Sequence, residues 1–176
     1  EGKAPKPEKT AAALFRPVML STPVGDTDLD KLDPADFAAE WKWDGIRVQV
    51  VSEGGVKRLY SRTGDDVSGA FPDLVDTIAI DAVLDGELLV GRPPEWTGTF
   101  SDLQQRLNRK TVSAKMRDQF PAFVRCYDVL QDGAENVRDR PLTERRARLE
   151  RLIAQLDPSR FDLSPLVEFS DWSDLD

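Results

Sequence analysis

The 176-residue chain carries 24 Lys and Arg against 32 Asp and Glu, a net charge of −8. This charge argues against a protein that binds nucleic acid with its whole surface. The chain has no histidine, which excludes His triads, His metal sites and His general bases. Its single cysteine, Cys126, cannot form an internal disulfide and predicts a reducing, cytoplasmic location. No run reaches the ~18 apolar residues of a membrane helix.

The first segment, residues 1–15, is rich in Lys, Pro, Glu and Ala, which predicts a linker or the end of an expressed piece. One domain is expected over 16–176. Alternating apolar residues predict a strand from Ile46 to Gly54-Gly55 and a hairpin partner after it. Further strands are expected at 82–90, 122–130 and 167–169, with a Pro/Gly-rich loop at 91–98.

Helical spacing and capping residues predict helices between these strands. Thr143 is the predicted cap of the longest helix, in which Leu149, Leu152 and Leu156 share one face. The expected helices span about 34–39, 71–80, 100–108, 113–120 and 142–156, with another beginning near 170. Hairpins mixed with helices indicate an α+β fold with largely antiparallel sheets and flanking helices.

Two stretches are rich in cations. Residues 102–118 contain five cations and 138–151 contain six arginines. Such residues either contact phosphates or form solvated helix faces, and the sequence leaves both readings open.

The segment Glu40-Trp41-Lys42-Trp43-Asp44-Gly45-Ile46-Arg47 holds one lysine beside a flexible Asp-Gly turn and a strand. A lysine with a pKa of about 10.4 is a poor nucleophile. Desolvation and a nearby cation such as Arg47 would favour the neutral amine. By itself the pattern is also compatible with a surface lysine beside a turn. It resembles the K-x-D-G-x-R motif of the family that contains ATP-dependent DNA ligases, RNA ligases and mRNA capping enzymes.

Three further motifs follow in the order found in DNA ligases. Ser61-Arg62-Thr63-Gly64 ends the second strand, Asp85-Gly86-Glu87 lies on an apolar strand, and Phe123–Leu130 carries an aromatic-Asp pair at Tyr127-Asp128. Together with Arg16–Leu20 and Phe100–Lys110, these motifs resemble bacterial ATP-dependent DNA ligases over about 16–176. The resemblance implies the nucleotidyltransferase (ATP-grasp-like) fold of the adenylation domain. That domain is expected to be incomplete, because the later Glu-Gly and Lys-x-Lys motifs and an oligonucleotide-binding barrel do not follow.

The resemblance also implies roles for individual residues. Lys42 would attack ATP and carry AMP, which then passes to the 5′-phosphate of nicked double-stranded DNA. The implied nucleotide contacts involve stacking by Tyr127, purine-edge recognition by Glu40 and the backbone at Trp41, a ribose or phosphate contact by Arg47, a phosphate or sugar contact by Arg62, and a ribose contact by Glu87. The acid of Glu87 would also bind Mg²⁺ or Mn²⁺ in some steps.

Three alternatives to the DNA ligase interpretation remain. An RNA ligase and a capping guanylyltransferase that uses GTP share the lysine motif, and the third is a non-catalytic binding module with a nucleotidyltransferase-like fold. A role in DNA repair, recombination or replication is equally compatible with the motifs. Separate DNA-binding and oligonucleotide-binding domains are expected in the parent protein. The isolated chain is expected to self-adenylate slowly or not at all, and not to seal nicks.

Overall fold

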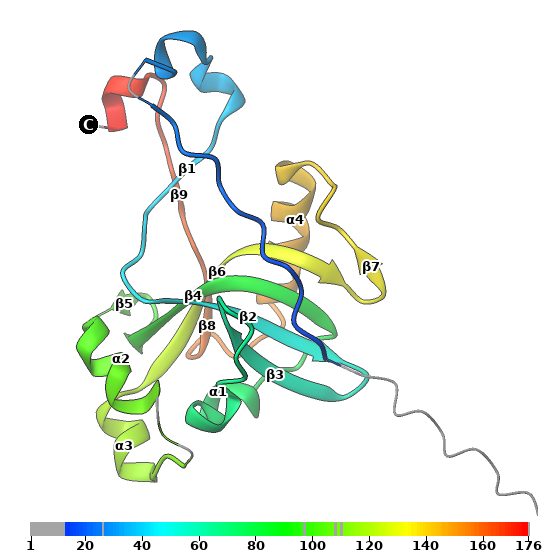
Figure 1. The fold of residues 1–176 in the computed structure, drawn as a ribbon, viewed down its shortest axis with the longest axis vertical. Helices are drawn as coiled ribbons and strands as arrows, with labels where there is room; N and C mark the ends of the chain where they lie inside the picture. Colours follow the sequence, from blue (N-terminus) through cyan, green and yellow to red (C-terminus); the bar gives the residue numbers. More distant parts are fainter. Residues whose placement is uncertain (1–12, 26, 97, 108, 110, 176) are drawn as a thin grey trace, which may run out of the picture.

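The hairpin predicted around Gly54-Gly55 forms, because β2 (Ile46–Glu53) pairs antiparallel with β3 (Val56–Ser61). Both glycines of the turn have positive φ, a conformation in which glycine is the least strained residue. This hairpin is one edge of the main sheet of the computed structural model (Figure 1). The structure describes residues 13–25, 27–96, 98–107, 109 and 111–175.

The main sheet has the strand order β3-β2-β4-β6-β7, with β5 paired to β4 and β8 paired to β6. Its remaining strands are β4 (Ala82–Arg92), β5 (Glu95–Trp96), β6 (Ala122–Asp132), β7 (Glu135–Asn136) and β8 (Phe161–Leu163). Among the pairs described, β6–β8 is parallel and the others are antiparallel. A separate two-stranded sheet joins β1 (Ala39–Glu40) to β9 (Leu166–Val167). The predicted α+β class with largely antiparallel sheets is confirmed.

Four α-helices accompany these strands in the described part of the chain. Figure 1 shows α1, α2 and α3 gathered at one end of the main sheet and α4 toward the other. They are α1 (Pro72–Val75), α2 (Phe100–Leu107), α3 (Ala114–Gln119) and α4 (Leu142–Ile153), with 3-10 turns at Leu29–Lys31, Pro34–Asp36, Ser68–Ala70 and Trp172–Leu175. None of the described helices has both the length and the apolar character needed to cross a membrane.

The pleat of the sheet separates two faces. Side chains such as Val48 of β2, Leu84 of β4 and Val124 of β6 join the main core, together with Leu74 of α1 and Leu149 of α4. Alternate residues of a strand point to opposite faces. The helices therefore cover one face of the sheet, and the residues between these core positions are directed to the other face.

The second face carries a smaller apolar cluster and the polar residues of three predicted motifs. The N-terminal segment lies against it, since Ala13 packs with Val51, Val83 and Leu130. The Arg16 backbone amide also donates to Gln49 Oε1 at 2.6 Å. The predicted division of the chain at residue 15 stays a prediction.

The structure differs from the predicted elements at several points. Thr143 is not the cap of α4, because Pro141 occupies the N-cap position and no side chain caps it. The predicted helix at 71–80 is reduced to α1, although Leu74 and Ile78 are buried as its pattern required. The loop at 91–98 contains β5, and the helix expected at 34–39 is a single 3-10 turn before β1. Asn108, the predicted end of α2, lies outside the described residues.

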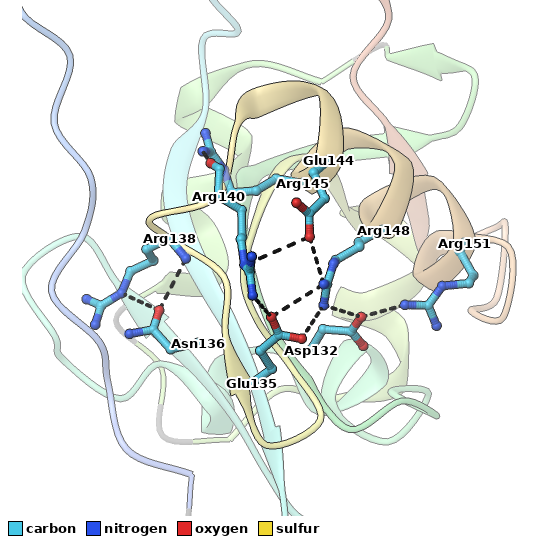
Figure 2. Close-up of polar contacts among 9 residues, drawn as sticks. All are labelled: Asp132, Glu135, Asn136, Arg138, Arg140, Glu144, Arg145, Arg148 and Arg151. Atoms are coloured by element: carbon cyan, nitrogen blue, oxygen red, sulfur yellow. Dashed lines mark hydrogen bonds and ion pairs between the residues drawn. The ribbon is translucent and has the colours of Figure 1, made fainter.

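Ion pairs tie α4 to the hairpin of β6 and β7 (Figure 2). Arg148 lies 2.8 Å from both Glu135 and Glu144, and Arg151 lies 2.5 Å from Asp132. Single surface ion pairs contribute little to stability, whereas a network of several linked pairs can hold α4 in one position against the hairpin. Most arginines of 138–151 are therefore engaged by carboxylates of the chain itself.

Arg106 of the other cation-rich stretch is neither solvated nor available to a phosphate. Its side chain is fully buried, pairs with Asp73, and donates to the backbone oxygens of Ala70 and Phe120. The guanidinium also lies 4.7 Å from the centre of the Phe71 ring. This arginine joins α2 to the segment around α1 and belongs to the core.

Candidate active site

A cavity of about 580 Å³ opens on the face of the sheet that the helices leave uncovered. All seven site residues predicted from the sequence line it, although they come from four separate motifs. The lining residues are Glu40, Trp41, Lys42, Trp43, Gly45, Ile46, Arg47, Arg62, Glu87 and Tyr127.

The loop between β1 and β2 presents Lys42 to this cavity. Gly45 fixes the loop against β4: a Cβ atom at this position would lie 2.3 Å from the Leu88 carbonyl oxygen. The Gly45 amide also donates to Glu87 Oε1 at 3.2 Å. The Lys42 side chain is exposed, so the desolvation expected from the sequence is not found in this state.

Glu87 lies directly opposite Arg47 in the register of β4 and β2. Burial raises the pKa of the Glu87 carboxyl to about 7, against the opposing effects of the Gly45 amide, Arg47 and Lys42. A carboxylate on an apolar strand is costly without partners. Here its partners are the residues of the lysine motif.

Arg47 is braced by an acid that the sequence analysis did not assign a role. Its guanidinium binds both oxygens of Asp85, with Nε 3.1 Å from Oδ1, and Nη2 donates to the Met19 carbonyl oxygen at 2.8 Å. Asp85 is 1% exposed, and burial raises its pKa while Arg47 lowers it. Arg47 also lies 5.9 Å from the centre of the Tyr127 ring. The guanidinium thus forms part of a fixed pocket wall.

Gly86, between Asp85 and Glu87, is required by the close approach of β6. A Cβ atom there would lie 2.8 Å from the Arg125 carbonyl oxygen. The pairing of β4 with β6 also shifts register between Asp85 and Gly86. Such irregularities redirect neighbouring side chains. The glycine of the Asp-Gly-Glu motif therefore has a packing reason.

Tyr127 and Glu40 line not only this cavity but also an adjoining one of about 270 Å³, which residues of α4 complete. Burial raises the pKa of the Tyr127 hydroxyl above its usual value. Arg146 Nη1 of α4 lies 3.4 Å from Glu40 Oε1. No pattern in the sequence indicates this contact, because it depends on the packing of α4 beside β1.

Trp43 lines the cavity and is fixed by two contacts of its ring. Its Nε1 donates to Ser164 Oγ at 3.0 Å, and the Arg125 guanidinium lies 4.2 Å from the centre of its ring. Trp41, in contrast, is 64% exposed. Arg62 is exposed, and no ion pair of its side chain occurs within the part of the chain that the structure describes.

The described residues include no cluster of three or more acidic or sulfur ligands that could hold a metal ion by themselves. Glu87 offers one carboxylate, of which Oε1 accepts from Gly45. Mg²⁺ is commonly bound by one or two carboxylates together with substrate phosphates and waters. The site therefore fits a metal that arrives with a nucleotide rather than a preformed protein cage.

Solved structures of DNA ligases share this fold. The ligase domain of LigD from M. tuberculosis superposes with a TM-score of 0.61 at 27% identity, covering 82% of this chain and 44% of that one. A mycobacterial DNA ligase D in complex with ATP and MES gives 0.58 at 28% identity, covering 77% and 42%. A Lig E DNA ligase gives 0.64 at 16% identity, covering 91% and 54%, which supports the fold alone. The chain thus has the nucleotidyltransferase fold of ligase adenylation domains, as predicted.

The sequence comparison identifies the family. Residues 18–176 match the family described as ATP dependent DNA ligase domain, and the chain belongs to it. A probable DNA ligase of Koribacter versatilis is 35% identical over 86% of this chain and 27% of its own length. DNA ligase 2 of Methanosarcina acetivorans is 32% identical over 87% and 28%, respectively. The chain spans about a quarter of the length of these relatives.

Proposed function

We propose that this chain is the N-terminal major part of the adenylation domain of an ATP-dependent DNA ligase, with Lys42 as the nucleophile. The observation that carries the proposal is the convergence of four motifs on one cavity that presents Lys42. The family match supports ATP as the nucleotide. A relative of similar fold is described as a complex with ATP.

In the first step the Lys42 amine, after losing its proton, attacks the α-phosphorus of ATP. A phosphorus–nitrogen bond forms, and the bond to the leaving pyrophosphate breaks. The AMP group then passes to the 5′-phosphate at a DNA nick, which releases Lys42. Finally the 3′-hydroxyl attacks that phosphate, expels AMP and seals the strand. Catalysis of phosphoryl transfer depends mainly on positioning and on stabilising charge.

The cavity wall supplies the positions that these steps need. The Tyr127 ring offers an aromatic face for a base, and the Glu40 carboxylate can accept a hydrogen bond from a base edge. Arg47, braced by Asp85, and Arg62 at the mouth offer guanidinium groups suited to a ribose or phosphate oxygen. Glu87 would contact the ribose hydroxyl, and the backbone at Trp41 would contact the purine edge.

We further propose that Mg²⁺ or Mn²⁺ accompanies the nucleotide, with Glu87 as its protein ligand in some steps. Bound to the phosphates, the ion would neutralise charge that develops during transfer. Nicked double-stranded DNA is the proposed partner. The DNA-binding and oligonucleotide-binding domains expected in the parent protein would bind it as well. We also propose a cytoplasmic location, because the single Cys126 forms no internal disulfide.

Intact mass spectrometry tests the proposal. The purified chain is incubated with Mg²⁺ and either ATP or GTP, and a longer chain of the same protein is treated in parallel. On the longer chain, a single AMP adduct that forms from ATP and is absent from Lys42→Ala is expected; on the purified 176-residue chain the adduct should form slowly or not at all. Lys57→Ala, a substitution on the β2–β3 hairpin, is the matched control and should retain the adduct.

Each other result has a defined meaning. A GMP adduct formed from GTP would instead support a capping enzyme. An AMP adduct that persists in Lys42→Ala would refute Lys42 as the nucleophile. No adduct on either chain would refute the enzymatic function and support a binding module.

A further inference from the structure

Two successive arginines of α4 engage two carboxylates beside the cavity. Arg145 binds both oxygens of Asp128, at 2.8 and 3.2 Å. Arg146 lies 3.4 Å from Glu40 Oε1 and 3.0 Å from Glu150 on its own helix. The Arg146 side chain is only 14% exposed. Its charge is therefore held in place from both sides.

The Glu40 carboxylate is surrounded by groups from three elements. Burial and the nearby Asp128 of β6 raise its pKa, whereas Arg146 of α4 and hydrogen bonding by Ser164, which lies just before β9, lower it. Ser164 is itself 1% exposed and accepts from Trp43. Arg145 neutralises Asp128 and so relieves part of the repulsion. Arg146 is the cation that favours the ionised form of Glu40.

We propose that Arg146 is a positioning residue that fixes the Glu40 carboxylate as the acceptor for the exocyclic amine of adenine, and thereby sets the preference of the site for ATP over GTP. This inference rests on the proposed function and deepens it. Arg146 contacts Oε1, and in this proposal Oε2 is the atom that accepts from the amine. An ionised carboxylate accepts from the amine of adenine, whereas guanine has a carbonyl oxygen at the same ring position, which a carboxylate repels.

The location of Arg146 supports this role over a purely structural one. Glu40, Tyr127 and Arg146 all line the adjoining 270 Å³ cavity, together with apolar residues of α4 and β9. Glu40 and Tyr127 also line the cavity that presents Lys42. A base stacked on Tyr127 would therefore meet the carboxylate that Arg146 holds.

The test compares nucleotide binding by Arg146→Met and by the unsubstituted chain. Methionine keeps much of the apolar stem of arginine but removes its charge. Binding is followed by isothermal titration calorimetry with ATP, GTP and the triphosphate of purine riboside, which lacks the exocyclic amine. Arg151→Met is the matched control, because Arg151 lies on the same helix, is exposed and pairs with Asp132 away from the cavities.

Hydrogen bonds to charged groups contribute enough to expect a loss of about tenfold in ATP affinity in Arg146→Met. Affinity for purine riboside triphosphate should stay unchanged, so that the preference for the amine disappears. Arg146→Lys should retain part of the ATP affinity that Arg146→Met loses. The control Arg151→Met should bind ATP as tightly as the unsubstituted chain. As the pH is lowered, the ATP affinity of Arg146→Met should begin to weaken at a higher pH than that of the unsubstituted chain, because Glu40 becomes protonated more readily without Arg146.

Equal losses for ATP and purine riboside triphosphate would overturn the inference, because a general disturbance of the pocket affects both ligands alike. Unchanged ATP binding in Arg146→Met would overturn it as well. If Arg146→Met does not fold, as judged by urea unfolding, Arg146→Gln, which also removes the charge, carries the same comparison. Failure of the unsubstituted chain to bind any nucleotide would instead refute the proposed function, and the inference with it.

Discussion

Gly45→Ala is expected to damage the candidate site and the stability of the chain together. The new Cβ would lie 2.3 Å from the Leu88 carbonyl oxygen, 2.8 Å from a Leu89 methyl carbon and 3.0 Å from Glu87 Cγ. The first of these neighbours is backbone of a central strand and cannot turn aside. To reach even a 3.0 Å contact, the loop that carries Lys42 must move away from β4 by about 0.7 Å.

This movement sets the magnitude of the expected effects. Overpacking of this kind costs about 1–3 kcal/mol of unfolding free energy, and the 3.2 Å hydrogen bond from Gly45 to Glu87 lengthens further. A misplacement of ~1 Å at a reacting group can cost ~10²-fold in rate. We therefore expect AMP transfer to Lys42 to slow by about 10- to 100-fold. Urea unfolding measures the first effect, and mass spectrometry of the adduct over time, on the longer chain of the same protein, measures the second.

Gly54→Ala is the matched control. Gly54 has a φ of +56° in the β2–β3 turn, and nothing lies within 4 Å of a Cβ placed there. Alanine in this conformation costs about 1–2 kcal/mol, a loss similar to that of Gly45→Ala, but far from Lys42. Its AMP transfer should be unchanged. Normal AMP transfer by Gly45→Ala, or an equal slowing in Gly54→Ala, would refute the reasoning.

Two further outcomes are expected. Arg106→Met leaves Asp73 with Arg160 as its remaining ion-pair partner, at 3.1 Å, and removes the donor to the Ala70 and Phe120 carbonyl oxygens. It should cost about 1–3 kcal/mol of unfolding free energy in urea, whereas the exposed Arg109→Met should change it by less than about 0.5 kcal/mol; equal effects would contradict the buried pairing. Because the pKa of Glu87 is raised from 4.5 to about 7 on folding, the folded state binds this proton more tightly, and stability should fall as the pH rises through that window. Glu87→Gln should flatten this part of the pH profile, and an unchanged profile would refute the assigned shift.

Local patterns in the sequence predict most strands of the main sheet and most of the residues that line the cavity. The alternation from Ile46 and the paired glycines at Gly54-Gly55 are sufficient to define a hairpin, because both signals act between near neighbours. The four motifs also contain every residue predicted for the site. Their meeting in one cavity follows from the register of β2, β4 and β6, which places Arg47 opposite Glu87.

Contacts between distant segments could not be predicted in the same way. Arg106 was indistinguishable from the other cations of its stretch, because burial depends on Asp73 and on the packing of α2. The contact of Arg146 with Glu40 needs α4 to lie beside β1, and no periodicity encodes that placement. β8 was missed because three residues are too few for a strand pattern, and its pairing with β6 is parallel.

The short sheet of β1 and β9 has a consequence for the order in which the site assembles. Glu40 pairs with Leu166 and Ala39 with Val167, so the strand just before Lys42 is held by a segment near the other end of the described chain. Closing so long a loop is entropically costly, and only two residue pairs compensate for it. The loop that carries Lys42 is held by β4 through Gly45 on one side and by the β1–β9 pairing on the other. During synthesis, it would therefore lack the second of these contacts until residue 167 had emerged. In the folded protein, the part of the cavity lined by Glu40 would open more readily than the part lined by Glu87 of β4. A nucleotide could then enter the cavity without disturbing the core.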